Sequence, residues 1–186
     1  MSVLQVDKIQ DAAGTTNKEL AEYSSGNWSW GAGVPAGTVI SMKAVSFNNT
    51  SVNTDSQDWQ AVSQLDLTIN RTSGTHLLYY LQGGGAYTGG AGQGMYTLIQ
   101  RSDGTSYGST NVTILGGADT HGHSRFYGGS GAILGPYSVM AYDSASVSGN
   151  KTYRTFYKSG GSYTVNFQDA DRGEITAMIM EFIPTT

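Results

Sequence analysis

The sequence predicts an all-β fold, an antiparallel jelly-roll-like β-sandwich with an extended N-terminal arm. Short segments with alternating apolar and polar residues recur along the chain, and Gly, Asn and Asp turn residues separate them. Strands with a turn signal every ~8–12 residues are typical of a sandwich or barrel. No segment has a convincing helical period. The 12 Tyr residues outnumber Phe and Trp together, and Tyr suits strand surfaces because its ring packs while its hydroxyl stays hydrated.

About nine segments are expected to form strands. They cover residues 38–47, 59–69, 75–82, 95–101, 111–115, 137–142, 151–158, 162–167 and 175–183. In the second segment Val62 is out of phase with Leu65 and Leu67, which indicates a late start or a β-bulge. The segments 83–94 and 116–135 are rich in glycine, and we expect both to be surface loops.

The last strand, residues 175–183, is the most hydrophobic, so both of its faces are expected to be covered. Alternate residues of a strand point to opposite faces. One face therefore carries Met178, Met180 and Phe182. The other carries Ile175, Ala177, Ile179 and Ile183. We assign the Met/Phe face to the core of an oligomer and the Ile face to the interior of the sandwich.

Composition excludes several classes of function. A net charge of -4 gives no basic footprint for nucleic acid. The absence of cysteine rules out disulfides, thiolate zinc sites and a cysteine nucleophile. No apolar run approaches the ~18 residues that a membrane span needs, so no membrane insertion is expected. The N-terminus also lacks the features of a secretory signal peptide. No cofactor motif stands out, and we expect no cofactor.

Residues 1–37 differ from residues 38–186, which read as one β-sandwich domain. The arm has a short apolar stretch, a polar linker and two Trp residues. Its candidate anchoring residues are Val3, Leu4, Val6, Ile9, Trp28 and Trp30. The arm has too little apolar surface to fold alone, so we expect it to order on a partner, by adding an edge strand to a neighbouring sheet. The alternatives are a frayed tail, and Trp side chains that pack on their own domain.

Catalytic chemistry has little support. The acidic residues are scattered, and several fall in turns, where Asp is favoured for local hydrogen bonds. No nucleophile has a base at a recognisable spacing. We therefore expect that the chain is not an enzyme. The competing hypothesis, a depolymerase, requires two carboxylates about 5–10 Å apart in a cleft.

Two features could bind a ligand. His121 and His123 form an H-x-H pair, and imidazole suits transition metals; the alternative is an ordinary polar loop. The two glycine-rich segments hold Tyr87, Arg125, Phe126 and Tyr127. Aromatic side chains among small residues suit sugar stacking and adaptable polar contacts, although these segments could simply connect strands.

Four segments carry a resemblance to a known family. The opening LQVDKIQDAAGT, the start of the domain at GTVISMKAVSF, the pattern W-x-x-V-x-x-L-x-x-T-I from Trp59, and the closing ITAMIMEFIP resemble small virion structural and tail-fibre-like proteins of tailed bacteriophages, of the marine phage and cyanophage type. The resemblance implies a non-enzymatic structural role in the virion, contacts with other virion proteins and a homotrimer. Some trimeric phage fibres also hold a metal ion in H-x-H pairs.

These observations together predict a structural component of a tailed-phage virion. It would be a short fibre, a collar or a capsid decoration that docks by its arm and assembles as a homotrimer. The alternative is a receptor- or carbohydrate-binding tip domain of a phage fibre, with a host-surface glycan as its ligand.

Overall fold

The chain is all-β wherever the structure describes it. The computed structural model describes residues 8–11, 18–24, 27–30, 36–47, 52–88, 93–102, 111–114, 122–128, 133–168 and 173–184. These ranges contain strands β1 to β14 and no helix, and every strand pair between them is antiparallel. Accordingly, no described segment is a helix of the length and hydropathy that crossing a bilayer requires. The predicted fold class is confirmed at this level.

One large sheet, called the β8 sheet below, has the strand order β10-β8-β12-β6, and β9 also pairs with β8. Its strands are β6 (Gln60–Arg71), β8 (Gln93–Ser102), β9 (Asn111–Thr113), β10 (Ser124–Gly128) and β12 (Gly149–Ser159). Strands β9 and β10 pair with different halves of β8. They therefore occupy the same edge of the sheet, one after the other.

The second large sheet, called the β7 sheet, has the order β4-β14-β7-β13-β5, with β11 also paired to β7. Its strands are β4 (Val39–Phe47), β5 (Val52–Thr54), β7 (His76–Thr88), β11 (Ile133–Asp143), β13 (Val165–Gln168) and β14 (Ile175–Phe182). β14 pairs with β7 as far as Gly83, and β13 pairs with the residues beyond. Strand β11 takes the other edge of β7.

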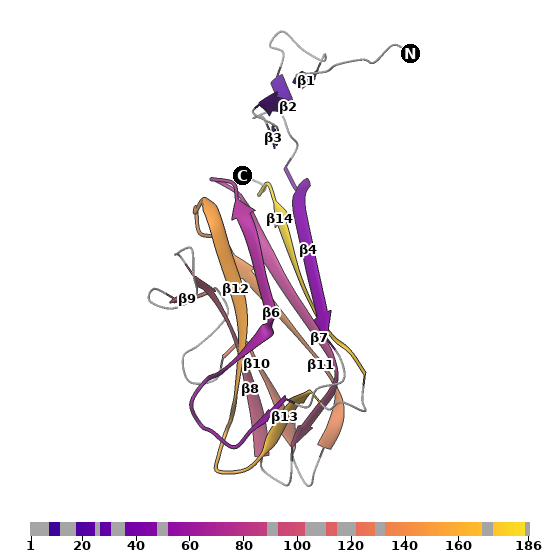
Figure 1. Cartoon of the computed structure of the whole chain (residues 1–186), viewed down its shortest axis with the longest axis vertical. Coiled ribbons are helices and arrows are strands. Elements are labelled where there is room, and N and C mark those ends of the chain that lie inside the picture. The colour runs from indigo at the N-terminus through magenta and orange to yellow at the C-terminus, as the bar shows by residue number, and fades with distance from the viewer. Residues whose placement is uncertain are drawn as a thin grey trace.

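The core lies between these two sheets, which Figure 1 shows packed face to face. Buried and half-buried residues alternate along β12 and β14, as expected for strands with one face toward a core. On β14, Ile175, Ala177 and Ile179 are fully buried. The inward assignment of these three residues is therefore confirmed, whereas Ile183 follows the end of the strand and is half-buried.

A third, small sheet forms within the predicted arm. Its order is β1-β2-β3, from β1 (Lys8–Asp11), β2 (Lys18–Ser24) and β3 (Asn27–Trp30). In register, Ile9 and Trp30 both lie opposite Ala21, and Trp28 lies opposite Tyr23. Figure 1 places this sheet beyond one end of the sandwich. The polar stretch that was expected to be a linker therefore contains strands.

The prediction of a surface loop at 83–94 is wrong for most of its length, because β7 continues to Thr88 and β8 begins at Gln93. The reason is visible at Gly83, which pairs in register with Tyr137 of β11. A Cβ at Gly83 would lie 2.6 Å from Cε1 of Tyr137. The glycine makes room for the ring, and the ring covers the glycine, so the strand tolerates a residue that otherwise weakens it.

Of the two alternatives for the strand that contains Val62, a late start or a bulge, the structure has the bulge, because β6 already begins at Gln60. The register between β12 and β6 shifts between Tyr153, which lies opposite Leu67, and Thr155, which lies opposite Val62. Extra residues of β6 therefore face a single residue of β12, which is the definition of a β-bulge. The bulge lets Val62 and Leu65 both point into the core, where each is fully buried.

Candidate functional site

The outer face of the β7 sheet carries an apolar surface, called the methionine face below. It holds four of the six methionines together with neighbouring apolar and aromatic side chains: Met42, Leu78, Tyr80, Met140, Tyr142, Met178, Met180 and Phe182. They belong to β4, β14, β7 and β11, which are adjacent in the sheet. Since residues directly opposite each other on antiparallel strands share a face, the register defines this surface.

Two cross-strand rows form the centre of the methionine face. In one row Met180 lies between Met42 and Leu78. In the next row Tyr80 lies between Met178 and Met140. Met42 is 61% exposed and Met140 is 67% exposed. These two side chains lie on the outer strands of this surface, with β14 and β7 between them. A group of apolar side chains with exposed members and a polar border is a candidate interaction surface.

An aromatic group closes one end of the methionine face. The ring of His76 contacts Tyr142 edge to face, with centroids 5.3 Å apart, and Phe182 at 6.2 Å. His76 Nδ1 is also hydrogen-bonded to the hydroxyl of Tyr142. The three side chains therefore support each other, and the surface is fixed by packing and not only by strand geometry.

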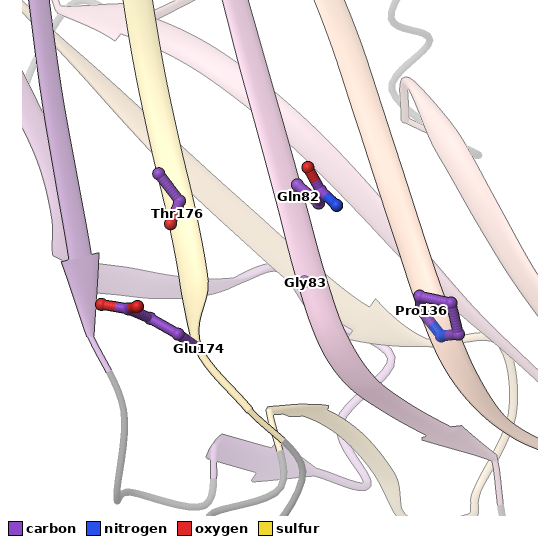
Figure 2. Close-up of a pocket in the computed structure, with 5 residues that line it drawn as sticks. All are labelled: Gln82, Gly83, Pro136, Glu174 and Thr176. Atoms are coloured by element: carbon purple, nitrogen blue, oxygen red, sulfur yellow. The ribbon is translucent and has the colours of Figure 1, made fainter.

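Two shallow hollows lie at the polar end of the same sheet. Figure 2 shows the larger one, about 330 Å³, lined by Gln82, Gly83, Pro136, Glu174 and Thr176. The second, about 230 Å³, shares Gln82 and Pro136 with the first. Its other lining residues are Tyr80, Tyr137 and Ser138. Among the described lining residues of the two hollows, Glu174 is the one carboxylate. General acid–base hydrolysis of a glycoside requires two carboxylates, and the described lining residues contribute one.

The described residues also include a buried ionic cluster that joins the two sheets. Arg71, Arg101 and Tyr153 come from the β8 sheet, whereas Asp143 and Glu181 come from the β7 sheet. All five are at most 3% exposed. The positive charges of the cluster thus lie on the β8 sheet, and the negative charges lie opposite them on the β7 sheet.

Asp143 is the centre of the cluster. Arg101 Nη1 donates to both carboxylate oxygens at 2.7 and 2.6 Å, and Arg71 Nη1 donates to Oδ2 at 3.1 Å. The Tyr153 hydroxyl adds a donor at 2.7 Å. Burial favours the neutral acid, but the hydrogen bonds from Arg101, Tyr153 and the Ala145 N–H, together with the Arg101 charge, outweigh it, so the pKa of Asp143 lies below its usual value.

Glu181 completes the cluster from the last strand. Its Oε1 accepts hydrogen bonds from the backbone N–H of Thr72 at 2.7 Å and from the Thr75 hydroxyl, and it lies 3.5 Å from Arg71 Nε. Both carboxylates are therefore paired and buried. They hold the sheets together and are not presented to a cleft.

The sequence reasoning missed this cluster, although one signal was present. Glu181 occupies the same alternating positions as Ile175, Ala177 and Ile179, so strand periodicity alone places it on the inner face. A carboxylate among inward-facing aliphatic residues requires a buried partner. Which cations would reach it depends on the pairing of distant strands, and the sequence gives no such pairing.

The four residues predicted as a ligand loop all lie on strands, so the loop prediction is wrong. Tyr87 is on β7, whereas Arg125, Phe126 and Tyr127 are on β10. Phe126 turns inward and packs against the core, but Arg125 and Tyr127 are exposed on the outer face of the β8 sheet. Arg125 and Tyr127 therefore lie together on one surface, which neither Tyr87 nor Phe126 shares.

His123 has a structural role in the part of the chain that is described. Its Nδ1 accepts a hydrogen bond from the backbone N–H of Ile99 at 3.0 Å, and its Nε2 lies 3.0 Å from the carbonyl oxygen of Ile114. Both ring nitrogens thus contact the backbone. His121 lies outside the described residues, and the described residues hold no group of three or more potential metal ligands.

The anchoring residues remain predictions. Val3, Leu4 and Val6 lie outside the described residues. Ile9 belongs to β1, and Trp28 and Trp30 belong to β3, with Trp28 and Trp30 two positions apart on that strand. Neither a family model nor a curated protein matches the sequence. Function must therefore be inferred from the geometry above and from the resemblance of the sequence.

Proposed function

We propose that the chain is a structural subunit of a tailed-phage virion, a short fibre, collar or capsid decoration. It docks by its N-terminal arm and assembles as a homotrimer. The observation that carries the self-association is the methionine face, and the residues predicted for the oligomer core, Met178, Met180 and Phe182, lie on it. The virion role and the three-fold count come from the resemblance of the sequence.

A second copy of the chain is a suitable partner for this face. Methionine side chains are unbranched and polarisable, so they fill irregular gaps against another apolar surface. No charged side chain occupies the two central rows of the methionine face. Burying those rows therefore requires no desolvation of an ion, which would oppose association.

The area of the methionine face can be compared with the area that a stable subunit interface buries. With ~4.8 Å between strands and ~3.4 Å per residue, the apolar rows span about 300 Å². Stable interfaces bury about 800 Å² per partner. A stable interface must therefore extend well beyond the apolar rows, and the flanking polar row of Ser46, Thr176, Gln82 and Ser138 is the first part that it would add. These neutral side chains suit the rim of such an interface.

The strand order supports the jelly-roll class as part of the proposal. Four pairs are nested along the chain like one long hairpin: β4 with β14, β6 with β12, β7 with β11, and β8 with β10. Two further pairs, β14 with β7 and β12 with β8, join them into two sheets. A long hairpin rolled into two four-stranded sheets is the jelly-roll arrangement, which is frequent among capsid domains.

The oligomeric state tests the contact directly. Sedimentation equilibrium of the full chain at micromolar concentrations should give three times the 19.7 kDa chain mass. Met178→Asp places a charge at the centre of the methionine face, and this variant should sediment as a folded monomer. Ser63→Asp adds the same charge at an exposed position of β6 and should remain a trimer.

Oxidation gives a second readout that does not depend on mass. In the assembled protein, Met178 and Met180 should resist hydrogen peroxide, whereas in the Met178→Asp monomer Met180 should form the sulfoxide rapidly. A wild-type chain that sediments as a monomer at all concentrations, with Met178 and Met180 oxidised at the rate of exposed methionines, would refute the contact.

The virion role has its own test. Antibody against the chain, applied to purified particles of the phage that encodes it, should label one appendage or the capsid surface in electron micrographs. Particles without label, from cultures in which the protein is abundant, would refute a structural role while leaving the trimer unaffected.

A further inference from the structure

The outer face of the β8 sheet, on the opposite side of the sandwich from the methionine face, carries a row in which aromatic rings and cations alternate. Its order is Trp59, Lys158, Tyr96, Arg125 and Tyr127. Strand register explains the row, because Lys158 of β12 and Arg125 of β10 both lie directly opposite Tyr96 of β8. Trp59 precedes β6, and Tyr127 lies two residues after Arg125 on the same face.

Each cation of the row lies against two rings. The Cζ atom of Arg125 is 4.0 Å from the ring centroid of Tyr127 and 5.2 Å from that of Tyr96. Lys158 Nζ is 4.6 Å from the Trp59 ring and 6.0 Å from the Tyr96 ring. These distances are within the range of cation–π attraction. The rings thus hold both positive charges in fixed positions on the surface.

Gly94 of β8 leaves the space in which the side chains of Arg125 and Tyr127 pack. A Cβ at this position would be 2.9 Å from Arg125 Nε and 3.3 Å from Tyr127 Cδ2. Any larger residue would displace the guanidinium from between the two tyrosine rings. The sequence therefore uses a glycine to place an arginine, and not to form a loop.

Neither cation of the row forms an ion pair with a carboxylate of the described residues. Arg154, on the same face of β12, is different because Asp66 binds its Nε at 2.7 Å. The Arg125 guanidinium lies against the two rings, and it carries N–H groups that can donate to an anionic ligand. A planar carboxylate accepts two such hydrogen bonds side by side.

We propose that this row binds an acidic polysaccharide whose negative charges are carboxylates, that is, a uronic-acid chain. Arg125 pairs with one carboxylate and Lys158 with another, about 10 Å away across β8. The ring of Tyr127, which is 44% exposed and lies beyond Arg125 in the row, offers an apolar surface to the sugar on that side of the Arg125-bound carboxylate. Nucleic acid fits less well, because its non-specific binding depends on neutralising many phosphates with Lys and Arg, and the row offers two cations on a chain of net charge -4.

The test uses the full chain and an oligomannuronate hexasaccharide, with maltohexaose as the neutral control and dT10 as the nucleic-acid control. Titration calorimetry should show binding of the oligomannuronate that weakens as salt is raised, and none of maltohexaose. Arg125→Gln should weaken the binding about 10-fold or more, because it removes charge-assisted hydrogen bonds. Lys158→Gln should weaken it less, and Arg125→Lys should restore part of the loss.

Lys151→Gln is the matched control, because it removes the same charge from the other end of β12 and should leave affinity unchanged. The trimer mass should be the same for all four variants, so a failure of the glycan proposal is distinguishable from a failure of the subunit contact. Wild-type protein that does not bind oligomannuronate, that binds maltohexaose equally well, or that prefers dT10 would overturn the proposal. So would an Arg125→Gln variant that retains full affinity in a folded state.

Discussion

At the scale of single residues, the two sheets are held together by a small group of buried charged side chains, although charged residues make up only 13% of the sequence. Asp143 and Glu181 are separated from Arg71 and Arg101 by long stretches of sequence, yet all four meet in the core. Burying ions is costly unless each has a partner. Here the two arginines and two carboxylates balance, and the Tyr153 hydroxyl adds a further donor to Asp143. The cluster fixes which ends of the two sheets lie together.

Removing one member of the cluster should therefore cost far more than removing a surface pair. Asp143→Asn leaves Arg71 and Arg101 without their shared counter-charge, and we expect the free energy of unfolding to fall by about 3–5 kcal/mol. Urea denaturation measures the loss. In the matched control, Asp66→Asn, the partner Arg154 is 20% exposed, and the loss should stay within about 1 kcal/mol. Equal losses in the two variants would contradict the role of the cluster.

The same carboxylate predicts a dependence of stability on pH. The folded pKa of Asp143 lies below its usual value of 3.8, so in acid the unfolded chain binds this proton first. Its stabilisation is thus fully present above the unfolded pKa and is lost as pH falls through the folded pKa. The difference in unfolding free energy between wild type and Asp143→Asn should therefore shrink from about pH 5 to about pH 2. A difference that stays constant over this range would contradict the assignment.

At the scale of elements, a glycine inside a strand weakens the strand unless a neighbouring side chain packs over it. Gly83 lies in the middle of β7 because the ring of Tyr137 on β11 covers it, and the same ring packs on Phe126 and Phe167 with centroids 6.4 and 5.5 Å apart. Burial raises the pKa of the Tyr137 hydroxyl well above its usual value. The ring therefore stays neutral in the core at ordinary pH.

A methyl group at Gly83 should push the Tyr137 ring away from β7 and so weaken the contact between β7 and β11. Gly83→Ala places a Cβ 2.6 Å from Tyr137 Cε1, and forcing the packed ring to move should cost about 1–3 kcal/mol. Gly135→Ala is the control on β11, since its Cβ would meet nothing closer than 3.9 Å; it should change stability by no more than about 0.5 kcal/mol. Thermal unfolding measures both. If Gly83→Ala were as stable as Gly135→Ala, the covering role of Tyr137 would be wrong.

At the scale of the whole molecule, the two sheets have different outer surfaces. The outer face of the β7 sheet is apolar and rich in methionine, whereas that of the β8 sheet carries the alternating cations and rings. Two surfaces of different chemistry on opposite sides of one sandwich allow one side to meet further copies of the chain while the other remains accessible. The proposed contact and the proposed glycan site therefore do not compete for the same residues.

The arm gives the prediction that belongs to this scale. Strands β1, β2 and β3 pair only with one another among the described residues, so deletion of residues 1–30 should leave the sandwich folded, with its melting temperature and its trimer mass unchanged. The truncated protein should not be incorporated into particles if the arm is the proposed anchor. Circular dichroism, sedimentation and blotting of purified particles measure these outcomes. A truncated chain that is unfolded or monomeric would show that the arm belongs to the core.

Local alternation was enough to predict the all-β class, most strand positions and the two faces of β14, because the pleat of a strand imposes alternation on its own residues. Near Val62 the same pattern indicated an irregularity and left a late start or a bulge as the alternatives. The folded arrangement was needed to show that Gly83 and Arg125 lie in strands, that Glu181 contacts Arg71, and that four methionines share one surface. Each of these depends on which distant strands become neighbours and in which register. That choice is made by the packing of the whole core, and no short segment contains it.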